Sequence, residues 1–251
     1  SCKNSTQADH LYLDYNCLIH HCKNTFQTIS SSQRDIEEEL ITSIIQYTSH
    51  IICDIVKPRK LVFISIDGQV PLGKVNKQRY RRYKKVQDES YKKKVYEKNG
   101  KTYVEYFNSN KITPGTQFMS KLSSRLKSCA KLGSFNKHTS HNFNVFISDS
   151  NVPGEGEQKI MDFIRNGNPK GNGLYPNMVI YGLDADLIIL SMLLQKQNIK
   201  LLREPQHTNV EMQSYSTEPF LYFDIDKCVD ALLKEYLLSH WDRSNVIEDI
   251  S

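Results

Sequence analysis

Short apolar runs rich in β-branched residues alternate with helix-like stretches along this chain, and that alternation constrains its fold most strongly. Strands separated by helices are typical of a parallel sheet with crossover helices. We therefore expect an α/β fold in which a mostly parallel central sheet is flanked by helices. The predicted strands are Leu11 to Asp14, Leu61 to Asp67, Asn144 to Asp149 and Met178 to Asp184, and each ends in an aspartate.

Helices and loops are predicted for the intervals between these runs. Residues 36–55 carry apolar side chains at helical spacing and should cover one face of the sheet. Thr113-Pro114-Gly115 predicts the start of another helix, with the proline in its first turn. Residues 99–111 and 166–177 contain turn-forming residues and predict loops. A chain of 251 residues can bury one large core, and we expect residues 1–251 to form a single domain.

Positive charge is concentrated in residues 74–98. This segment holds eleven Lys and Arg residues against three Asp and Glu, a net charge of +8, so the rest of the chain carries −3 of the overall +5. Helix-forming residues dominate it and apolar positions are few, which predicts a helix that projects from the body or lies on it. Such a charge run is explained by a solvated helix face, or by a patch that grips a nucleic-acid backbone without selectivity.

The cysteines and the apolar segments indicate the compartment. The six cysteines include no Cys-x-x-Cys pair, which favours neither a zinc module nor a disulfide framework. The first residues show no basic leader followed by an apolar run, and no apolar stretch approaches the ~18 residues that span a bilayer. We expect a soluble protein without a membrane partner, located in the cytoplasm, with the nucleus as the alternative.

Acidic residues gather where the predicted strands end. Ligands of open α/β sheets bind outside the carboxyl ends of the strands, so these side chains should converge at one edge. Two pairs have i, i+2 spacing, which places both side chains on the same side of an extended backbone. Mutual repulsion calls for cations, and an all-oxygen set suits Mg²⁺ or Mn²⁺, two of which can serve phosphodiester hydrolysis. The acids are Asp14, Asp67, Glu155, Glu157, Asp184 and Asp186.

Helix capping is the alternative explanation for these acids. Aspartate is a common N-cap and turn residue, and it follows many strands for that reason alone. A cap needs only one side chain, however, and two doubled acids exceed that need. The joint pattern therefore favours a metal site over capping.

The acids lie within longer strings that resemble the Xrn family of 5′→3′ exoribonucleases. The strings occur in the family's order over nearly the whole chain, and PGEGE and GLDADL, together with the basic stretch, are highly specific. They are LYLDYNCLIHHC at 11–22, FISIDGQVPLGKVNKQRYRRYKK at 63–85, ITPGTQFM at 112–119, SDSNVPGEGEQKIMDFIR at 148–165 and YGLDADLIILSM at 181–192, with LLRE at 201–204 as a weaker match.

This resemblance implies a PIN/FEN-like nuclease core that hydrolyses 5′-monophosphorylated single-stranded RNA to nucleoside 5′-monophosphates, with two Mg²⁺ or Mn²⁺ ions held by the six acids as catalytic residues. We also expect Lys74 to lie close enough to the scissile phosphate to stabilise developing charge. The residues that match the pocket for the 5′-phosphate are Lys74, Gln78, Arg81 and Arg82, and His20 matches a histidine that stacks on the terminal nucleotides. On a helix the four pocket residues share one face, where cations and an amide can converge on a phosphate.

The sequence departs from the family's pattern in three places. Family members carry a further aspartate in a Gly-Asn-Asp motif after a segment resembling Ser244 to Ile250, and the sequence ends at Ser251 before that motif. We therefore expect an incomplete domain with one metal ligand missing. Cys17 stands in place of the usual glycine and Gln158 in place of the usual histidine.

Two alternative functions stay open, namely a weak or inactive fragment that binds RNA 5′ ends and a DNA flap nuclease of the related PIN-like superfamily.

Overall fold

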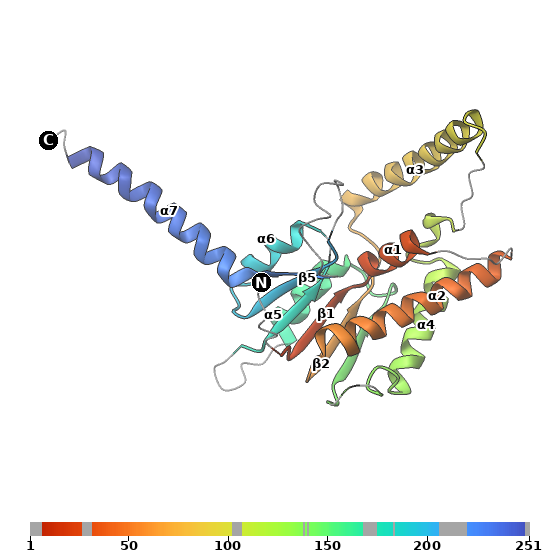
Figure 1. The fold of residues 1–251 in the computed structure, drawn as a ribbon, viewed down its shortest axis with the longest axis horizontal. Coiled ribbons are helices and arrows are strands. Elements are labelled where there is room, and N and C mark those ends of the chain that lie inside the picture. Colours follow the sequence, from red (N-terminus) through yellow and green to blue (C-terminus); the bar gives the residue numbers. More distant parts are fainter. Residues whose placement is uncertain are drawn as a thin grey trace.

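A six-stranded sheet forms the centre of the molecule, in the order β3-β2-β1-β4-β5-β6 (Figure 1). The computed structural model describes residues 7–26, 32–101, 107–137, 139, 141–167, 175–182, 184–205 and 220–248. Strands β1 to β5 pair in parallel and β6 pairs antiparallel to β5. The strands are β1 (His10–Asp14), β2 (Leu61–Ser65), β3 (Asn144–Ser148), β4 (Met178–Tyr181), β5 (Ile199–Arg203) and β6 (Leu221–Asp224).

Helices cover both faces of the sheet, which confirms the predicted α/β class. Helices α1, α2 and α4 lie on one face, and α5 and α6 lie on the other (Figure 1). The helices are α1 (Tyr15–Thr25), α2 (Gln33–His50), η1 (Ile51–Val56), α3 (Leu72–Lys98), η2 (Ser109–Lys111), α4 (Gln117–Lys131), α5 (Gly156–Gly167), α6 (Asp186–Leu193) and α7 (Ile225–Glu248).

Alternating side chains along the strands build a core on each face of the sheet, because successive residues of a strand point to opposite faces. Leu11 and Leu13 of β1 belong to the buried cluster that includes α1, α2 and α4. Tyr12, between them, belongs to the second cluster with Ile160 of α5 and Leu187 of α6. The sheet is thus held rigidly from both sides, with its strand ends fixed in place.

All four predicted strands are present, and each aspartate lies at the strand end or shortly after it. Asp14 is the last residue of β1, and Asp149 directly follows β3. Strand β2 ends at Ser65, two residues before Asp67, and β4 ends three residues before Asp184. Strands β5 and β6 were not predicted.

Two predicted helices differ in detail from the structure. The helix expected over residues 36–55 is α2 followed by a π-helical turn, η1, after which the Lys57 N–H donates to the Ile52 carbonyl at 3.0 Å. The expected start of the next helix at Pro114 was wrong, since α4 begins at Gln117. Its N-cap is Thr116, whose hydroxyl accepts from the Met119 N–H at 3.3 Å. Residues 102–106 and 168–174 of the two predicted loops lie outside the described residues.

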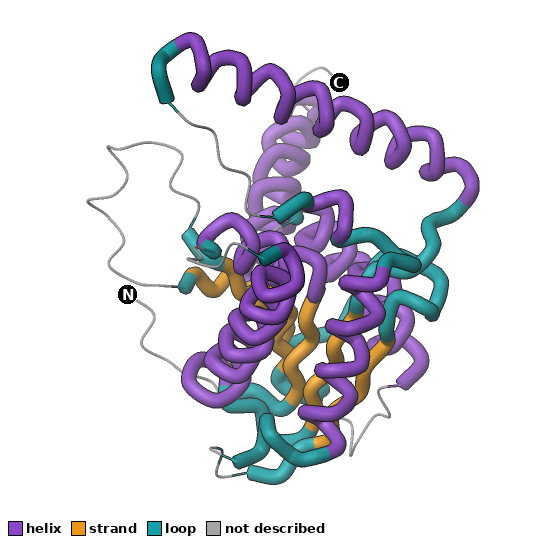
Figure 2. The backbone as a smooth tube through the Cα atoms, turned by 90° about the vertical axis from the view of Figure 1, so that its right-hand side faces the viewer, coloured by secondary structure: helices purple, strands orange, loops and turns teal. Residues whose placement is uncertain are grey.

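Helix α3 extends away from the sheet (Figures 1 and 2). None of its 27 residues is buried. Only its first turns approach the sheet, at the edge where the strands end. Across the residues that the structure describes, no helix has both the length and the apolar character needed to cross a membrane.

Candidate active site

The order of strands changes direction between β1 and β4. From β1 the chain builds outward through β2 and β3, and it then crosses to the other side of β1 to form β4 and β5. In open α/β sheets, ligands bind outside the strand ends at such a switch point. Asp14 and Asp184 follow the two strands that flank it. The topology therefore places the predicted acids where this class of fold binds its ligands.

Asp14 is the most deeply buried of the six acids, with 6% of its surface exposed. It occupies the N-cap position of α1, yet its side chain makes no capping hydrogen bond. Its Oδ2 instead accepts a hydrogen bond from Cys17 Sγ at 3.0 Å. Burial raises the pKa of Asp14 to about 7, and repulsion from neighbouring acids adds to this rise while the Cys17 bond opposes it. A buried carboxyl that caps nothing argues against the capping explanation at this position.

Asp67 is held by residues from two other elements. Asn16 of α1 donates its Nδ2 to Asp67 Oδ2 at 2.8 Å, and its Oδ1 accepts from the Asp67 backbone N–H at 3.2 Å. The Gly156 N–H, at the start of α5, donates to Asp67 Oδ1 at 2.6 Å. Burial raises the pKa of Asp67, and the Gly156 hydrogen bond partly offsets that rise. The carboxylate is therefore fixed in orientation before any ligand binds.

The carboxylates of Asp14 and Asp67 converge over Gly156. A Cβ atom at Gly156 would lie 3.0 Å from Asp14 Oδ1 and 3.2 Å from Asp67 Oδ1. Any side chain at this position would occupy the space that both oxygens face, and glycine leaves it open. Carboxylate oxygens from different strands that approach one point are donors of the type that Mg²⁺ and Mn²⁺ prefer.

The doubled acids lie at helix starts, and the prediction that they sit on extended backbone was wrong. Glu155 immediately precedes α5 and Glu157 lies in its first turn. Asp184 precedes α6, and Asp186 is the first residue of that helix. The chain turns into a helix directly after each loop, and acids in a first turn interact favourably with the helix dipole. The helix dipole therefore partly accounts for Glu157 and Asp186, although neither occupies an N-cap position.

Mutual repulsion links all six acids at this edge of the sheet. Burial raises the pKa of Glu157, and repulsion from Glu155 and from the two acids at the start of α6 raises it further. Asp184 likewise contributes to the raised pKa values of Asp14 and Asp67. Among the described residues, no three His, Cys, Asp or Glu side chains are already arranged as a metal-binding set. The acids share an edge without forming a closed ligand cage.

Lys74, in the first turn of α3, lies against these acids. Its Nζ forms an ion pair with Glu155 Oε2 at 2.6 Å, and this hydrogen bond raises the pKa of Lys74. The Lys74 side chain is 54% exposed, so the pair contributes little to stability. The pair joins the first turn of α3 to the acidic edge, which is the edge of the sheet that carries the six acids.

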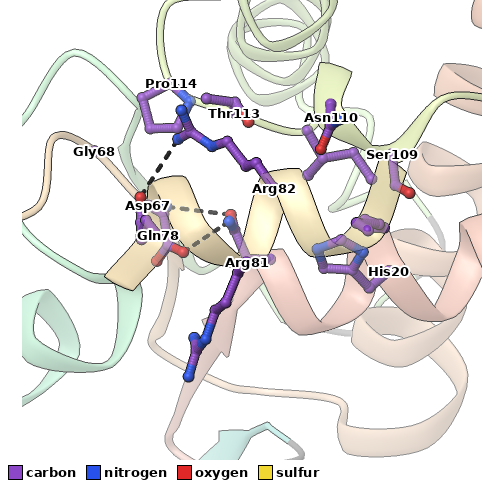
Figure 3. Close-up of a pocket in the computed structure, with 13 residues that line it drawn as sticks. His20, Asp67, Gly68, Gln78, Arg81, Arg82, Ser109, Asn110, Thr113 and Pro114 are labelled. Atoms are coloured by element: carbon purple, nitrogen blue, oxygen red, sulfur yellow. Dashed lines mark hydrogen bonds between the residues drawn. The ribbon is translucent and has the colours of Figure 1, made fainter. Parts of the chain in front are cut away.

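A cavity of about 200 Å³ opens beside the acids, between α1, α3 and residues 109–114 (Figure 3). Four of the five residues predicted to bind the RNA 5′ end line it, namely His20, Gln78, Arg81 and Arg82, whereas Lys74 does not. Arg82 donates to Gln78 Oε1 at 3.4 Å. Burial lowers the pKa of His20 to about 4. At neutral pH its ring is therefore uncharged and suited to stacking on a base.

The comparison with known proteins decides the family. The family profile described as "XRN 5'-3' exonuclease N-terminus" matches residues 1–205, most of the chain. The chain belongs to this XRN family.

Two XRN relatives show the extent of the similarity. A protein named 5'-3' exoribonuclease 2 from Neurospora crassa is 37% identical over 222 residues, which cover 80% of this chain and 20% of that protein. One named 5'-3' exoribonuclease 1 from Schizosaccharomyces pombe is 39% identical over 202 residues, covering 79% of this chain and 15% of that protein. The chain thus spans a fifth or less of the length of these two XRN relatives.

Several residues that support this XRN site were not among those predicted. Asn16 could have been noticed, since it lies two residues after Asp14 in a matching string. Lys159 is buried in α5, and its Nζ donates to the carbonyls of Ile66 at 2.8 Å and Asp149 at 3.0 Å. It ties together the ends of β2 and β3. Nothing in the sequence spacing marks this lysine, because its partners are backbone carbonyls of distant strands.

Gly68 keeps two loops of the XRN site in contact. Its N–H donates to the Gly154 carbonyl at 2.8 Å, and a Cβ added here would meet the Val152 carbonyl oxygen at 1.9 Å. We expect Gly68→Ala to lower the free energy of unfolding by about 1–3 kcal/mol, because backbone has to move. Gly73→Ala is the matched control, since nothing lies within 4 Å of that position. Urea unfolding of both variants checks this; equal stability would contradict the assigned contact.

Proposed function

We propose that this chain is a divalent-metal-dependent 5′→3′ exoribonuclease domain that hydrolyses 5′-monophosphorylated single-stranded RNA and releases nucleoside 5′-monophosphates. One observation carries the proposal. Asp67 belongs both to the acidic edge and to the lining of the cavity that holds Gln78 and Arg82. An RNA end bound in the cavity would therefore place its first phosphodiester beside the acids. The names of the XRN relatives support the same activity.

The acidic edge supplies the ligands for the metal in this proposal. Two divalent ions bound there would stabilise the attacking and leaving oxygens of the phosphodiester. Asn16 and Gly156 orient the Asp67 carboxylate for this role, and Cys17 orients that of Asp14. The ammonium of Lys74 would stabilise negative charge that develops on the phosphate. The proposed metal ligands are Asp14, Asp67, Glu155, Glu157, Asp184 and Asp186.

The cavity supplies the selection for a 5′-monophosphate. The guanidinium groups of Arg81 and Arg82 offer planar donors that match phosphate oxygens, and Gln78 adds an amide donor. A hydroxyl end would leave these donors unpaired, and a capped or triphosphorylated end is bulkier and should fit the cavity poorly. The neutral ring of His20 would stack on the terminal base.

We also propose that the protein works in the cytoplasm, with the nucleus as the alternative. Among the described residues no cysteine forms a disulfide, as is usual where thiols are kept reduced. The described cysteines are Cys17, Cys22, Cys53, Cys129 and Cys228.

Hydrolysis of RNAs that differ only in their 5′ end tests this function. With Mg²⁺, the 5′-monophosphorylated strand should be shortened and the 5′-hydroxyl strand should persist. Addition of EDTA should stop the reaction. Equal degradation of both strands would contradict the end selection. Tight binding of the phosphorylated strand without shortening would instead identify a fragment that binds and protects RNA ends.

A further inference from the structure

The outer face of α3 carries a feature that the proposed exonuclease activity does not use. Three tyrosines on it are among the most exposed aromatic side chains of the chain, at 68% for Tyr80, 69% for Tyr83 and 70% for Tyr91. Single exposed rings are ordinary, but exposed apolar side chains gathered along one surface indicate a site that contacts a partner. No hydrogen bond or ring contact involves these three side chains within the described part of the chain.

The three tyrosines form one stripe with lysines. Tyr80 and Tyr91 are separated by 11 residues, which is about three helical turns, and Tyr83 is three residues from Tyr80. Residues three, four or seven apart share a helix face, so three lysines at these distances from the tyrosines belong to the same stripe. The outer stripe consists of Lys77, Tyr80, Tyr83, Lys84, Tyr91 and Lys94. None of its lysines forms an ion pair with a described residue.

The outer stripe faces away from the cavity. The cavity is lined by Gln78, Arg82 and Lys85, which are four and three residues apart and share the other side of α3. Tyr80 follows Gln78 by two residues, which turns it roughly 200° around the helix. The two faces can therefore bind separate stretches of RNA. Over its length of roughly 26 Å, the stripe offers a track that the 5′-end site does not reach.

We propose that the outer stripe of α3 is a second binding site, which holds single-stranded RNA by base stacking on the tyrosines and phosphate contacts with the lysines. Every base has a face that can stack, whatever its identity, and aromatic rings between cations are typical of sequence-independent single-strand sites. The bases of a duplex are already stacked on one another, so a duplex offers no free base face to the tyrosines. An acidic peptide would pair with the lysines but would leave the rings unused.

The test uses a 5′-hydroxyl strand of about 20 nucleotides, which is long enough to cover the stripe. It carries no 5′-phosphate for the cavity to bind. Binding is measured by fluorescence anisotropy with EDTA present, so that the strand stays intact. Joint replacement of the three tyrosines by serine should weaken binding at least about tenfold, whereas replacement by phenylalanine should preserve it. Joint replacement of the three lysines by glutamine should reduce the slope of log affinity against log salt by about 2. Leu132→Ser, at a residue 72% exposed on another part of the surface, serves as the control.

Each result decides for or against the stripe. Loss with serine and retention with phenylalanine supports stacking. Equal affinity of all variants overturns the proposal, and so does a loss confined to the lysine variant, because that would indicate charge alone. A wild-type protein that binds acidic peptide but no 5′-hydroxyl RNA would overturn it too. None of these outcomes depends on nuclease activity, so the proposed function can fail or stand separately.

Discussion

Replacing Asp14 with asparagine is expected to lower nuclease activity at least about a hundredfold. Replacing a residue that only hydrogen-bonds to a metal ligand already lowers activity by up to that factor. The same change should make the metal-free protein more stable. Burial raises the pKa of this carboxyl from 3.8 to about 7, so the charged form opposes folding. Asparagine keeps the shape and an acceptor for the Cys17 Sγ–H, but it carries no charge to bury.

The raised pKa of Asp14 determines how the stability gained by this substitution depends on pH. A carboxyl whose pKa is higher in the folded state destabilises the fold above its unfolded pKa, so the penalty grows from pH 3.8 to about 7 and is then constant. At pH 8 in EDTA, Asp14→Asn should raise the free energy of unfolding by on the order of 2–4 kcal/mol. Below the unfolded pKa no gain is expected. Thermal unfolding of the variant and the wild type at pH 8 and below pH 3.8 checks this. A variant that is less stable than the wild type at pH 8 would contradict the account.

Replacing Arg82 with alanine is expected to lower kcat/KM for 5′-monophosphorylated RNA roughly 10- to 100-fold, because a hydrogen bond to a charged group contributes about 1.5–3 kcal/mol. Arg82 lines the cavity beside Gln78, where the phosphate is proposed to bind. Any slow reaction with 5′-hydroxyl RNA should be unaffected, since that end has no phosphate for Arg82 to bind. Arg82→Lys should be intermediate, because lysine keeps the charge without the planar fork.

Arg79→Ala is the matched control for this change. Arg79 lies on the same helix and is exposed, but it does not line the cavity. Its replacement removes the same charge and should leave the preference for a 5′-monophosphate unchanged. If both variants lose activity equally on both RNAs, α3 acts through general charge and the cavity is not a phosphate site.

The strands nearest the site were predictable from sequence, and the far edge of the sheet was not. Strands β1 to β4 carry β-branched residues between clear breaks, a local signal that the fold preserves. Strand β5, with the sequence Ile-Lys-Leu-Leu-Arg, contains mostly residues that favour helix. Its pairing with β4 decides its conformation, and pairing between distant segments leaves no local trace.

The acids could be predicted because they follow the strands, whereas the contacts that orient them could not. Asn16 and Asp67 are 51 residues apart, and their paired hydrogen bonds depend on how α1 packs beside the end of β2. Gly156 faces Asp14 and Asp67 only because α5 begins at the strand edge. The i, i+2 spacing of the doubled acids was informative, but its structural interpretation was wrong, since helix geometry replaces extended backbone there.

The most direct test of the central claim is the identity of the first product released from 5′-end-labelled, 5′-monophosphorylated single-stranded RNA in Mg²⁺. The account predicts that labelled nucleoside 5′-monophosphate appears first, without shorter labelled fragments. It also predicts no product from a variant that carries both Asp184→Asn and Asp186→Asn. A ladder of internal fragments, or mononucleotide release that survives in the double variant, would contradict the assignment of the acidic edge as a metal-dependent 5′→3′ exonuclease site.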